Sequence, residues 1–462
     1  MSDSIAENIA RWAATTKSAD LPDSVRDAAR RSFVDVVGLC LAARDTDYVK
    51  AAMNAWGGNG GGGECSVIGH GAKMDAAGAA FVNGTAAHGE DYDDTFEGTP
   101  VHTGAVAVPA VLAACEVNHR SSDDLIKGIA VAAELMCRMA LVQPTGQHKA
   151  GFHPTAVIGA MGAAAGVGAA LGLDENKIKD GLGVAGSFAS GIIEYLAEGA
   201  WTKRLHPGWA AQSGIRAALL GREGFLGPRT VFEGTHGFFY AFGVENIELD
   251  YTKMTGGLGD NWLMSNLAFK PYACGTMCQP YIDVARKLAA TGVDPAEIVE
   301  AECKVGEGIV HRLCEPAAEK AKPSTSYSAK FSVPYCVAVA FLDNAAGLLQ
   351  FTDQRIQAPK VLNLAGKVKY QIDPDNEYPA NYTGHLRVVL KDGSIHEMKQ
   401  PHLRGGAREP LSDEELSEKF HANAAYGGVS RDYASQLENT CADLFNGSEL
   451  QDLSKLIGTL EP

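Results

Sequence analysis

The chain has 462 residues, 46% of them hydrophobic and 21% charged, and a formal net charge of −16 at pH 7. Its length predicts two or three domains. A surface this acidic repels nucleic-acid phosphates and anionic lipids, and no apolar run reaches the roughly 20 residues of a membrane helix. We therefore expect neither a nucleic-acid nor a membrane partner.

The cysteines and the N-terminal residues bear on the compartment. The ten cysteines are scattered and include no CxxC pair, which is typical of free thiols in a reducing cytosol. The first residues show no basic segment followed by an apolar one, as a secretory signal would. We expect a cytoplasmic protein.

Residues 1–260 show mostly helical patterns. A helix is predicted to begin at Leu21–Asp23, with Pro22 in its first turn, because the following apolar residues recur at helical spacing. The glycine-rich stretch Trp56–Gly63 lacks the Lys-Ser/Thr of a phosphate loop, so we interpret it as a flexible loop. Residues 155–172 are almost entirely small and apolar, which predicts a helix buried on all sides.

The pattern changes near residue 270. Ala296–Val310 has alternating apolar positions and is predicted to be a strand, and Tyr382–Met398 gives two alternating runs around Lys391–Gly393, typical of a hairpin. Helical patterns return after Ser412.

These patterns predict a mainly α protein with a smaller α+β domain. We place a large all-helical domain at 1–266 and the α+β domain at 267–405. The C-terminal helices at 406–462 are expected to pack back on the helical domain.

The first candidate site is an acidic segment followed by a histidine. Four carboxylates lie within the five positions Glu90–Asp94, and His102 comes shortly after. The spacing is not that of a calcium loop. A solvated acidic loop remains open as an interpretation, as does an acid/base cluster with Thr95 and His102 as hydrogen-bonding partners.

Two helix starts carry histidine beside proline. His153 precedes Pro154 at the start of the buried helix, where the helix end favours a carboxylate ligand. Lys203 and His206 lie in a basic segment that is expected to precede the next helix. The alternatives are that His153 only caps its helix and that the basic segment is a solvated turn.

The fourth candidate is Phe269–Cys278, at the expected domain boundary, where pockets often form. Lys270 is a candidate base or anion-binding group, and Cys274 a candidate proton carrier if its pKa is lowered; the alternative is a buried, inert thiol. The sequence has no GxSxG, no HExxH and no zinc-type Cys/His spacing. We therefore expect acid/base chemistry without a metal.

These segments resemble the MmgE/PrpD family over most of the chain. The resemblance rests on the order and spacing of Phe81–His88, Asp91–Thr95, His102, Phe152–Pro154, Thr202–His206, Phe269–Tyr272 and Phe331–Tyr335. It implies an all-helical domain with a smaller α+β domain, usually in a homodimer. It also implies a small di- or tricarboxylate substrate and no required organic cofactor.

The resemblance also implies a pocket and roles within it. The family's pocket residues fall on Asp91, Thr95, His102, His153, Lys203 and Lys270. The two lysines would hold substrate carboxylates, His102 or His153 would transfer the α-proton, and Asp91 would orient a histidine. Other residues expected to bind substrate are Asp93, Tyr272, Cys274 and His206.

The reaction is predicted by comparison within the family. His102–Val106 lacks the Asp-Asn pair expected of 2-methylcitrate dehydratases, and Cys274 stands near the place of a histidine expected of cis-aconitate decarboxylases. We therefore predict an epimerase of an iminodisuccinate-like dicarboxylate. The alternatives are a lyase of either type and a non-catalytic carboxylate-binding protein.

Overall fold

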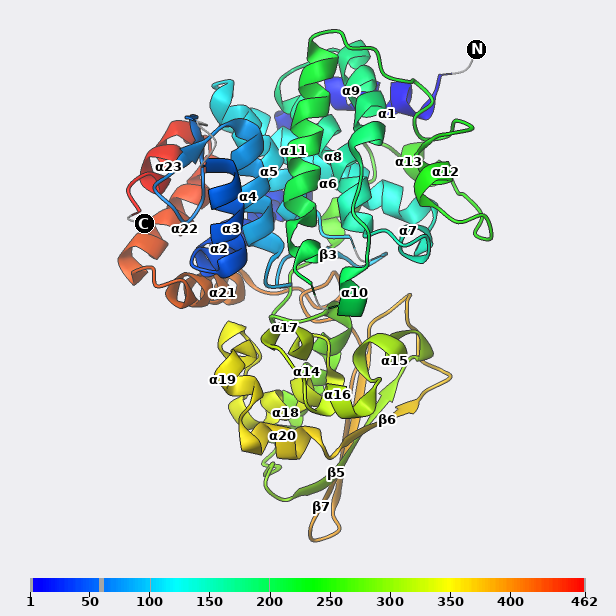
Figure 1. The fold of residues 1–462 in the computed structure, drawn as a ribbon, viewed down its shortest axis with the longest axis vertical. Coiled ribbons are helices and arrows are strands. Elements are labelled where there is room, and N and C mark those ends of the chain that lie inside the picture. Colours follow the sequence, from blue (N-terminus) through cyan, green and yellow to red (C-terminus); the bar gives the residue numbers. More distant parts are fainter. Residues whose placement is uncertain (1–2, 58–61, 100, 199, 461–462) are drawn as a thin grey trace. The chain divides into compact units, whose positions relative to one another are not determined.

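The computed structural model describes residues 3–57, 62–99, 101–198 and 200–460. Contacts divide the chain into two compact units (Figure 1). Unit 1 comprises Met1–Gly89, Asp93–Leu267 and Asp413–Pro462, and unit 2 comprises Glu90–Tyr92 and Ala268–Ser412. The short segment Glu90–Tyr92 therefore belongs to unit 2, although both of its chain neighbours belong to unit 1.

Unit 1 is built from helices and a two-stranded ribbon. Its elements are α1 (Ile5–Thr15), α2 (Asp23–Ala43), α3 (Asp47–Gly57), β1 (Cys65–Ser66), β2 (Lys73–Met74), α4 (Ala76–His88), α5 (Gly104–Val117), α6 (Ser122–Val142), α7 (Gly146–Lys149), α8 (Pro154–Ala170), α9 (Glu175–Phe188), α10 (Tyr195–Glu198), α11 (Thr202–Arg222), α12 (Phe238–Phe242), α13 (Thr252–Thr255), α21 (Asp413–Tyr426), α22 (Arg431–Leu444) and α23 (Leu450–Ile457). Among the helices of the described ranges, none combines the length and apolar character needed to cross a membrane.

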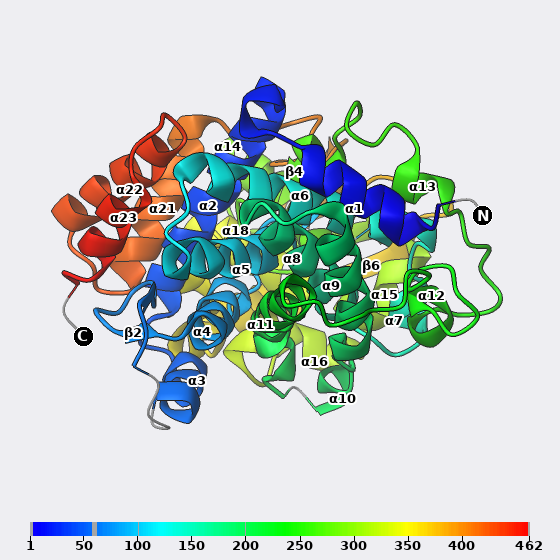
Figure 2. The ribbon, with the colours of Figure 1, turned by 90° about the horizontal axis from the view of Figure 1, so that it is seen from above.

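Helix α8 lies at the centre of unit 1. It packs against α5, α6, α9 and α11, which surround it in Figure 2. Each of its residues is buried, as the composition of 155–172 predicts. Glycine allows this close packing: a Cβ at Gly166 would lie 2.5 Å from the main-chain oxygen of Gly128 on α6.

Three local predictions for unit 1 need correction. Pro22 is the N-cap of α2 and precedes the first turn. Helix α3 extends through Trp56 to Gly57, so the predicted loop at 56–63 is helical at its start, and its residues 58–61 lie outside the described ranges. Lys203 and His206 lie inside α11, which begins at Thr202, whereas we expected them to precede that helix.

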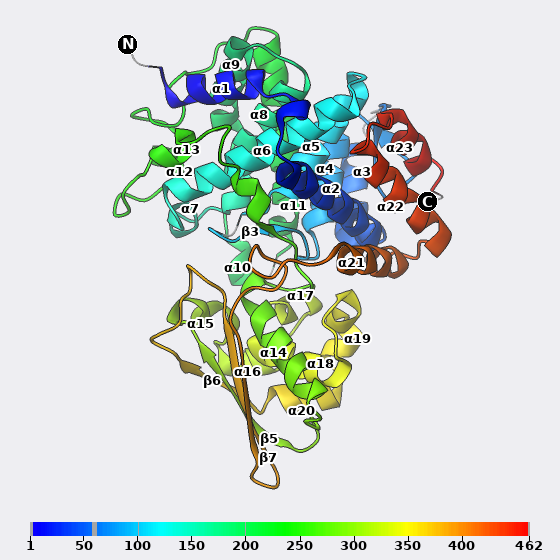
Figure 3. The ribbon, with the colours of Figure 1, turned by 180° about the vertical axis from the view of Figure 1, so that it is seen from behind.

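Unit 2 contains a four-stranded sheet with helices on one face (Figure 3). Its elements are α14 (Gln279–Ala290), β5 (Ile298–Val305), α15 (Glu307–Leu313), α16 (Ala317–Ala321), α17 (Ser326–Ala329), α18 (Val333–Asp343), α19 (Asp353–Ile356), α20 (Pro359–Ala365), β6 (Val368–Ile372), β7 (Gly384–Leu390) and β8 (Ile395–Gln400). The strand order is β6-β5-β7-β8, with β5 parallel to β6 and antiparallel to β7.

The sheet tests two predictions. The hairpin around Lys391–Gly393 is confirmed, because β7 and β8 pair antiparallel on either side of it. The strand predicted over Ala296–Val310 is too long: β5 ends at Val305, and α15 follows Gly306. The predicted fold class, mainly α with a smaller α+β part, is confirmed.

Candidate active site

Three histidine side chains gather inside unit 1. His88 ends α4, His102 precedes α5, and His153 is the N-cap of α8. The ring centroids of His88 and His102 are 4.8 Å apart, and each lies within 6.3 Å of the His153 centroid. All three residues are buried, with at most 6% of their surface exposed. Histidines separated by up to 65 positions of the sequence thus form one cluster.

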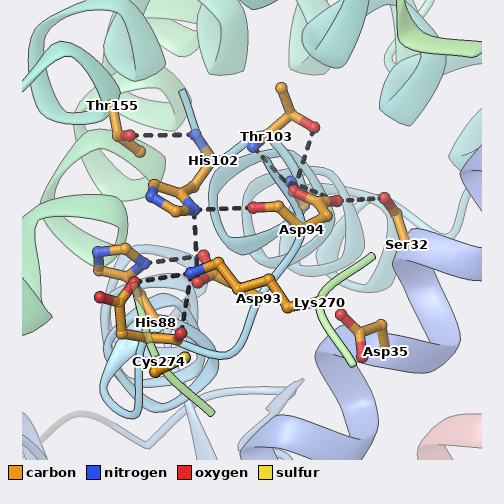
Figure 4. Close-up of polar contacts among 12 residues, drawn as sticks. Ser32, Asp35, His88, Asp93, Asp94, His102, Thr103, Thr155, Lys270 and Cys274 are labelled. Carbon is orange, nitrogen blue, oxygen red and sulfur yellow. Dashed lines mark hydrogen bonds and ion pairs between the residues drawn. The ribbon is translucent and has the colours of Figure 1, made fainter. Parts of the chain in front are cut away.

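Asp93 orients two of these rings (Figure 4). One carboxylate oxygen lies 2.8 Å from Nδ1 of His88, and the other lies 3.5 Å from Nδ1 of His102. Nδ1 of His102 also lies 2.7 Å from the main-chain oxygen of Asp94. Because a carbonyl oxygen only accepts, Nδ1 of His102 carries the hydrogen. In the neutral ring, Nε2 is then the basic nitrogen.

Asp94 fixes the loop to the start of α5. Its carboxylate accepts the main-chain N–H groups of Thr103 (3.1 Å) and Gly104 (2.9 Å), and the hydroxyl of Ser32 (2.5 Å). A Cβ at Gly104 would lie 2.5 Å from Asp94 Oδ2, so this contact requires glycine. Burial raises the pKa of Asp94 to about 6 despite these donors.

His153 is linked to His206 on α11. Their Nδ1 atoms lie 3.1 Å apart, so one ring donates and the other accepts. Burial, with the charge of Lys203 as the next cause, holds the pKa of His153 well below its usual value. Burial also lowers the pKa of His206 to about 3. Both rings are therefore neutral at physiological pH, and a neutral imidazole accepts protons.

A cavity of about 490 Å³ opens beside this histidine pair in unit 1. Its walls include Gly191, Tyr195, Leu205, His206 and Trp209. Gly191 has φ +135°, and a Cβ there would lie 2.4 Å from Cβ of Ala156, so glycine lets this wall approach α8. The cavity gives a ligand access to the ring of His206.

Unit 2 holds the segment Glu90–Tyr92 through buried lysines. Nζ of Lys270 donates to the main-chain oxygen and to Oδ1 of Asp91, both at 2.8 Å. Nζ of Lys330 lies 2.8 Å from the main-chain oxygen and 2.9 Å from Oε2 of Glu90. Both lysines are at most 2% exposed. A buried ammonium needs such partners, because desolvation strongly disfavours an uncompensated charge.

Several expected roles change with this geometry. The carboxylate that orients histidines is Asp93, whereas Asp91 pairs with Lys270. Asp93 is fully buried against the two imidazoles, and its role in substrate binding stays a prediction. Burial raises the pKa of Cys274, the opposite of what a proton carrier needs. The Tyr272 hydroxyl donates to Asp283 at 2.6 Å.

The predicted residues thus divide between the units. Unit 1 contains Asp93, Thr95, His102, His153, Lys203 and His206, and unit 2 contains Asp91, Lys270, Tyr272 and Cys274. The hydroxyl of Thr95 is buried and has no hydrogen-bond partner among the described residues, which suits a contact with a ligand.

Sequence reasoning assigned no role to His88, Asp94 or Lys330. His88 ends the segment Phe81–His88 and Lys330 directly precedes the segment Phe331–Tyr335, and both segments carry the family resemblance, which was the available signal. For Asp94 the signal was weaker: it is one of four clustered acids, and its position nine residues before Thr103 does not reveal that it caps α5.

Comparisons with known proteins agree with this architecture. The profile of the MmgE/PrpD N-terminal domain matches residues 7–249, and that of the C-terminal domain matches residues 272–444. A cis-aconitate decarboxylase from Aspergillus terreus is 27% identical, over 99% of this chain and 96% of its own length. The Homo sapiens cis-aconitate decarboxylase is 30% identical, over 75% of this chain and 72% of its own. With both family domains matched in order across most of its length, the chain belongs to the MmgE/PrpD family.

Proposed function

We propose that this protein is a cofactor-independent acid/base enzyme of the lyase type that acts on a small polycarboxylate. The observation that carries the proposal is the cluster of buried imidazoles in unit 1, where His153 and His206 are neutral and one carboxylate orients His88 and His102. Such a cluster can both accept and deliver protons at one place.

Different histidines of the cluster are suited to accept and to donate the proton. His153 is held neutral, which suits a proton acceptor. His102 lies 3.5 Å from the Asp93 carboxylate, and this negative charge stabilises an imidazolium electrostatically. We therefore assign His102 as the proton donor and His153 as the acceptor.

A substrate with several carboxylates needs positive charge in an acidic protein. Lys203 and the N-terminus of α8 supply it in unit 1. The electron pair left beside a carboxylate forms an enolate-like intermediate, which such positive groups stabilise. We propose that these groups bind the substrate carboxylates.

The named relatives favour a lyase over the predicted epimerase, because they are cis-aconitate decarboxylases. In decarboxylation, the C–C bond to one carboxylate breaks, CO2 leaves, and the remaining electron pair takes a proton from an acid. In epimerisation, the proton itself is removed and returned. Decarboxylation needs only the proton donor, whereas epimerisation needs both the acceptor and the donor, and the two reactions give different products. We propose decarboxylation of a cis-aconitate-like tricarboxylate as the first reaction to test.

The test is proton NMR in deuterated water with cis-aconitate and a panel of chiral dicarboxylates. We expect CO2 release with one deuterium placed in the product, and loss of at least about a hundredfold in kcat for His102→Gln, which removes the proton donor. His153→Gln removes the acceptor, so it should abolish epimerisation and reduce decarboxylation less. The control is His421→Gln on α21, which removes a histidine paired with Glu438.

Each other outcome has a meaning. Deuterium exchange without CO2 release would identify the epimerase. Binding of these acids without exchange or turnover would identify a carboxylate-binding protein. Full activity in both cluster variants would show that the assigned site is wrong.

A further inference from the structure

The imidazole cluster of unit 1 has the ligands of a metal site. His88, His102 and His153 each offer a nitrogen, and these three atoms all lie within 4.8 Å of one another. We propose that this cluster binds a divalent transition-metal ion such as Zn²⁺ through the three imidazoles. This departs from the absence of a metal site expected from sequence spacing.

The surroundings of each ring match those of metal-binding histidines. Such histidines usually donate their second ring nitrogen to a carboxylate or a carbonyl, which fixes the tautomer and the ring orientation. His88 meets the Asp93 carboxylate at 2.8 Å, and His102 meets the Asp94 carbonyl at 2.7 Å. Because Nδ1 makes these contacts, we assign Nε2 of both rings as the metal ligand.

His153 completes the set in the same way. Its Nδ1 is engaged by Nδ1 of His206 at 3.1 Å, so its Nε2 is again the assigned ligand. Three protein nitrogens with a fourth position for water are a common arrangement for zinc. Imidazole nitrogen selects zinc, copper, nickel or cobalt over magnesium and calcium, which prefer oxygen ligands.

Two features set the expected affinity. Zinc–nitrogen bonds of about 2.0–2.1 Å place tetrahedral ligands about 3.4 Å apart, so nitrogens now up to 4.8 Å apart must approach one another by up to about 1.4 Å. The positive charge of Lys203 acts on His153 and opposes a cation, while the Asp93 carboxylate beside two of the rings favours one. We therefore expect micromolar rather than nanomolar binding.

Metal binding would have a functional consequence. An ion on Nε2 of His102 and His153 occupies the lone pairs that proton transfer needs, so Zn²⁺ should inhibit the enzyme. This consequence rests on the proposed function, whereas the binding itself does not. Zinc binding with no turnover in the panel would reject only the proposed function, and turnover without zinc binding would reject only this inference.

The direct test is a Zn²⁺ titration of chelator-treated full-length protein in competition with a coloured chelator. We expect one site per chain, weakened about tenfold or more in His102→Gln and in His153→Gln. His421→Gln is the matched control, since it removes a histidine that contacts a carboxylate elsewhere in unit 1. Equal zinc affinity in the unmodified protein and both cluster variants would overturn the proposal.

Cobalt gives a second readout that needs no variant. Co²⁺ bound by three imidazoles gives a tetrahedral-type visible spectrum without a thiolate charge-transfer band. The ten cysteines are all free, so a thiolate band would place the ion on sulfur and overturn the assignment. A spectrum like that of hydrated Co²⁺ would also overturn it. If circular dichroism shows that a variant does not fold, this spectrum decides the question.

Discussion

Asp94 shows two opposing effects on one carboxyl group. Hydrogen bonds from Ser32 and Gly104 and its place at the N-terminus of α5 favour the charged form, yet burial dominates and raises its pKa to about 6. In the unfolded chain the carboxyl has its ordinary value, 3.8. Between these two values the folded protein binds a proton that the unfolded chain has lost, so stability falls as pH rises through this window.

Replacing Asp94 with asparagine should remove this pH dependence, because asparagine resembles the protonated acid. From pH 7 to pH 5, the free energy of unfolding of the unmodified protein should rise by about 1 kcal/mol relative to Asp94→Asn. The measurement is urea unfolding followed by circular dichroism at both pH values, with EDTA present.

The control for this comparison is Asp260→Asn, which changes an exposed carboxylate of unit 1. It should follow the unmodified protein at both pH values. A difference between unmodified protein and Asp94→Asn that stays constant, or that changes in the opposite direction, would show that Asp94 is charged in the folded state across this range.

At the scale of elements, glycine sets how closely the helices around the site approach. Gly84 on α4 and Gly208 on α11 face each other: a Cβ at Gly208 would lie 2.1 Å from the main-chain oxygen of Phe81, and one at Gly84 would lie 2.6 Å from Cα of Gly208. Main-chain atoms cannot move aside as a flexible side chain can. Gly208 lies two residues after His206 in α11. This contact therefore also fixes the position of His206, and of the His153–His206 pair, relative to α4.

Gly208→Ala should therefore separate α4 from α11. We expect a loss of about 1–3 kcal/mol in the free energy of unfolding, measured by urea denaturation. Gly366→Ala is the matched control, because a Cβ there meets its nearest neighbour at 3.4 Å and its φ of −65° suits alanine. Equal stability of the two variants would mean that α4 and α11 adjust without strain.

The elements also show which features local sequence patterns can predict and which they cannot. The buried helix α8 and the β7–β8 hairpin followed from local composition and periodicity. The four clustered acids gave no indication of which one faces an imidazole, because side-chain direction in a loop depends on its backbone. Asp91 has φ +53°, a left-handed conformation that no sequence period reveals.

Pairings between distant residues could not be predicted from the sequence, for a different reason. Lys330 pairs with Glu90 across 240 positions of the chain, and nothing in either local pattern indicates the other. The histidine cluster was predicted in part, since His102 was chosen for its place after the acidic segment and His153 for its place at a helix start. The third ring, His88, needed the fold to bring the end of α4 beside them.

At the scale of the whole molecule, the two units are not separate stretches of sequence. Glu90–Tyr92 contributes to unit 2 from within the part of the chain that forms unit 1. Inside unit 2 it supplies the partners of Lys270 and Lys330, and the Tyr92 hydroxyl donates to the main-chain oxygen of Pro271. A fragment of residues 268–412 therefore keeps both buried lysines and loses both carboxylates.

The loss of these carboxylates predicts that one pair of substitutions shifts the urea midpoint in opposite directions in the fragment and in the full chain. In the fragment 268–412, Lys270→Met with Lys330→Met removes two uncompensated buried charges and should raise the urea midpoint. In the full chain the same change leaves Glu90 and Asp91 without their ammonium partners and should lower it, since breaking a buried pair costs about 3–5 kcal/mol. Lys322→Met with Lys360→Met, both exposed, should shift neither midpoint appreciably. A shift of the same sign in fragment and full chain would mean that the lysines do not depend on Glu90–Tyr92 for their burial.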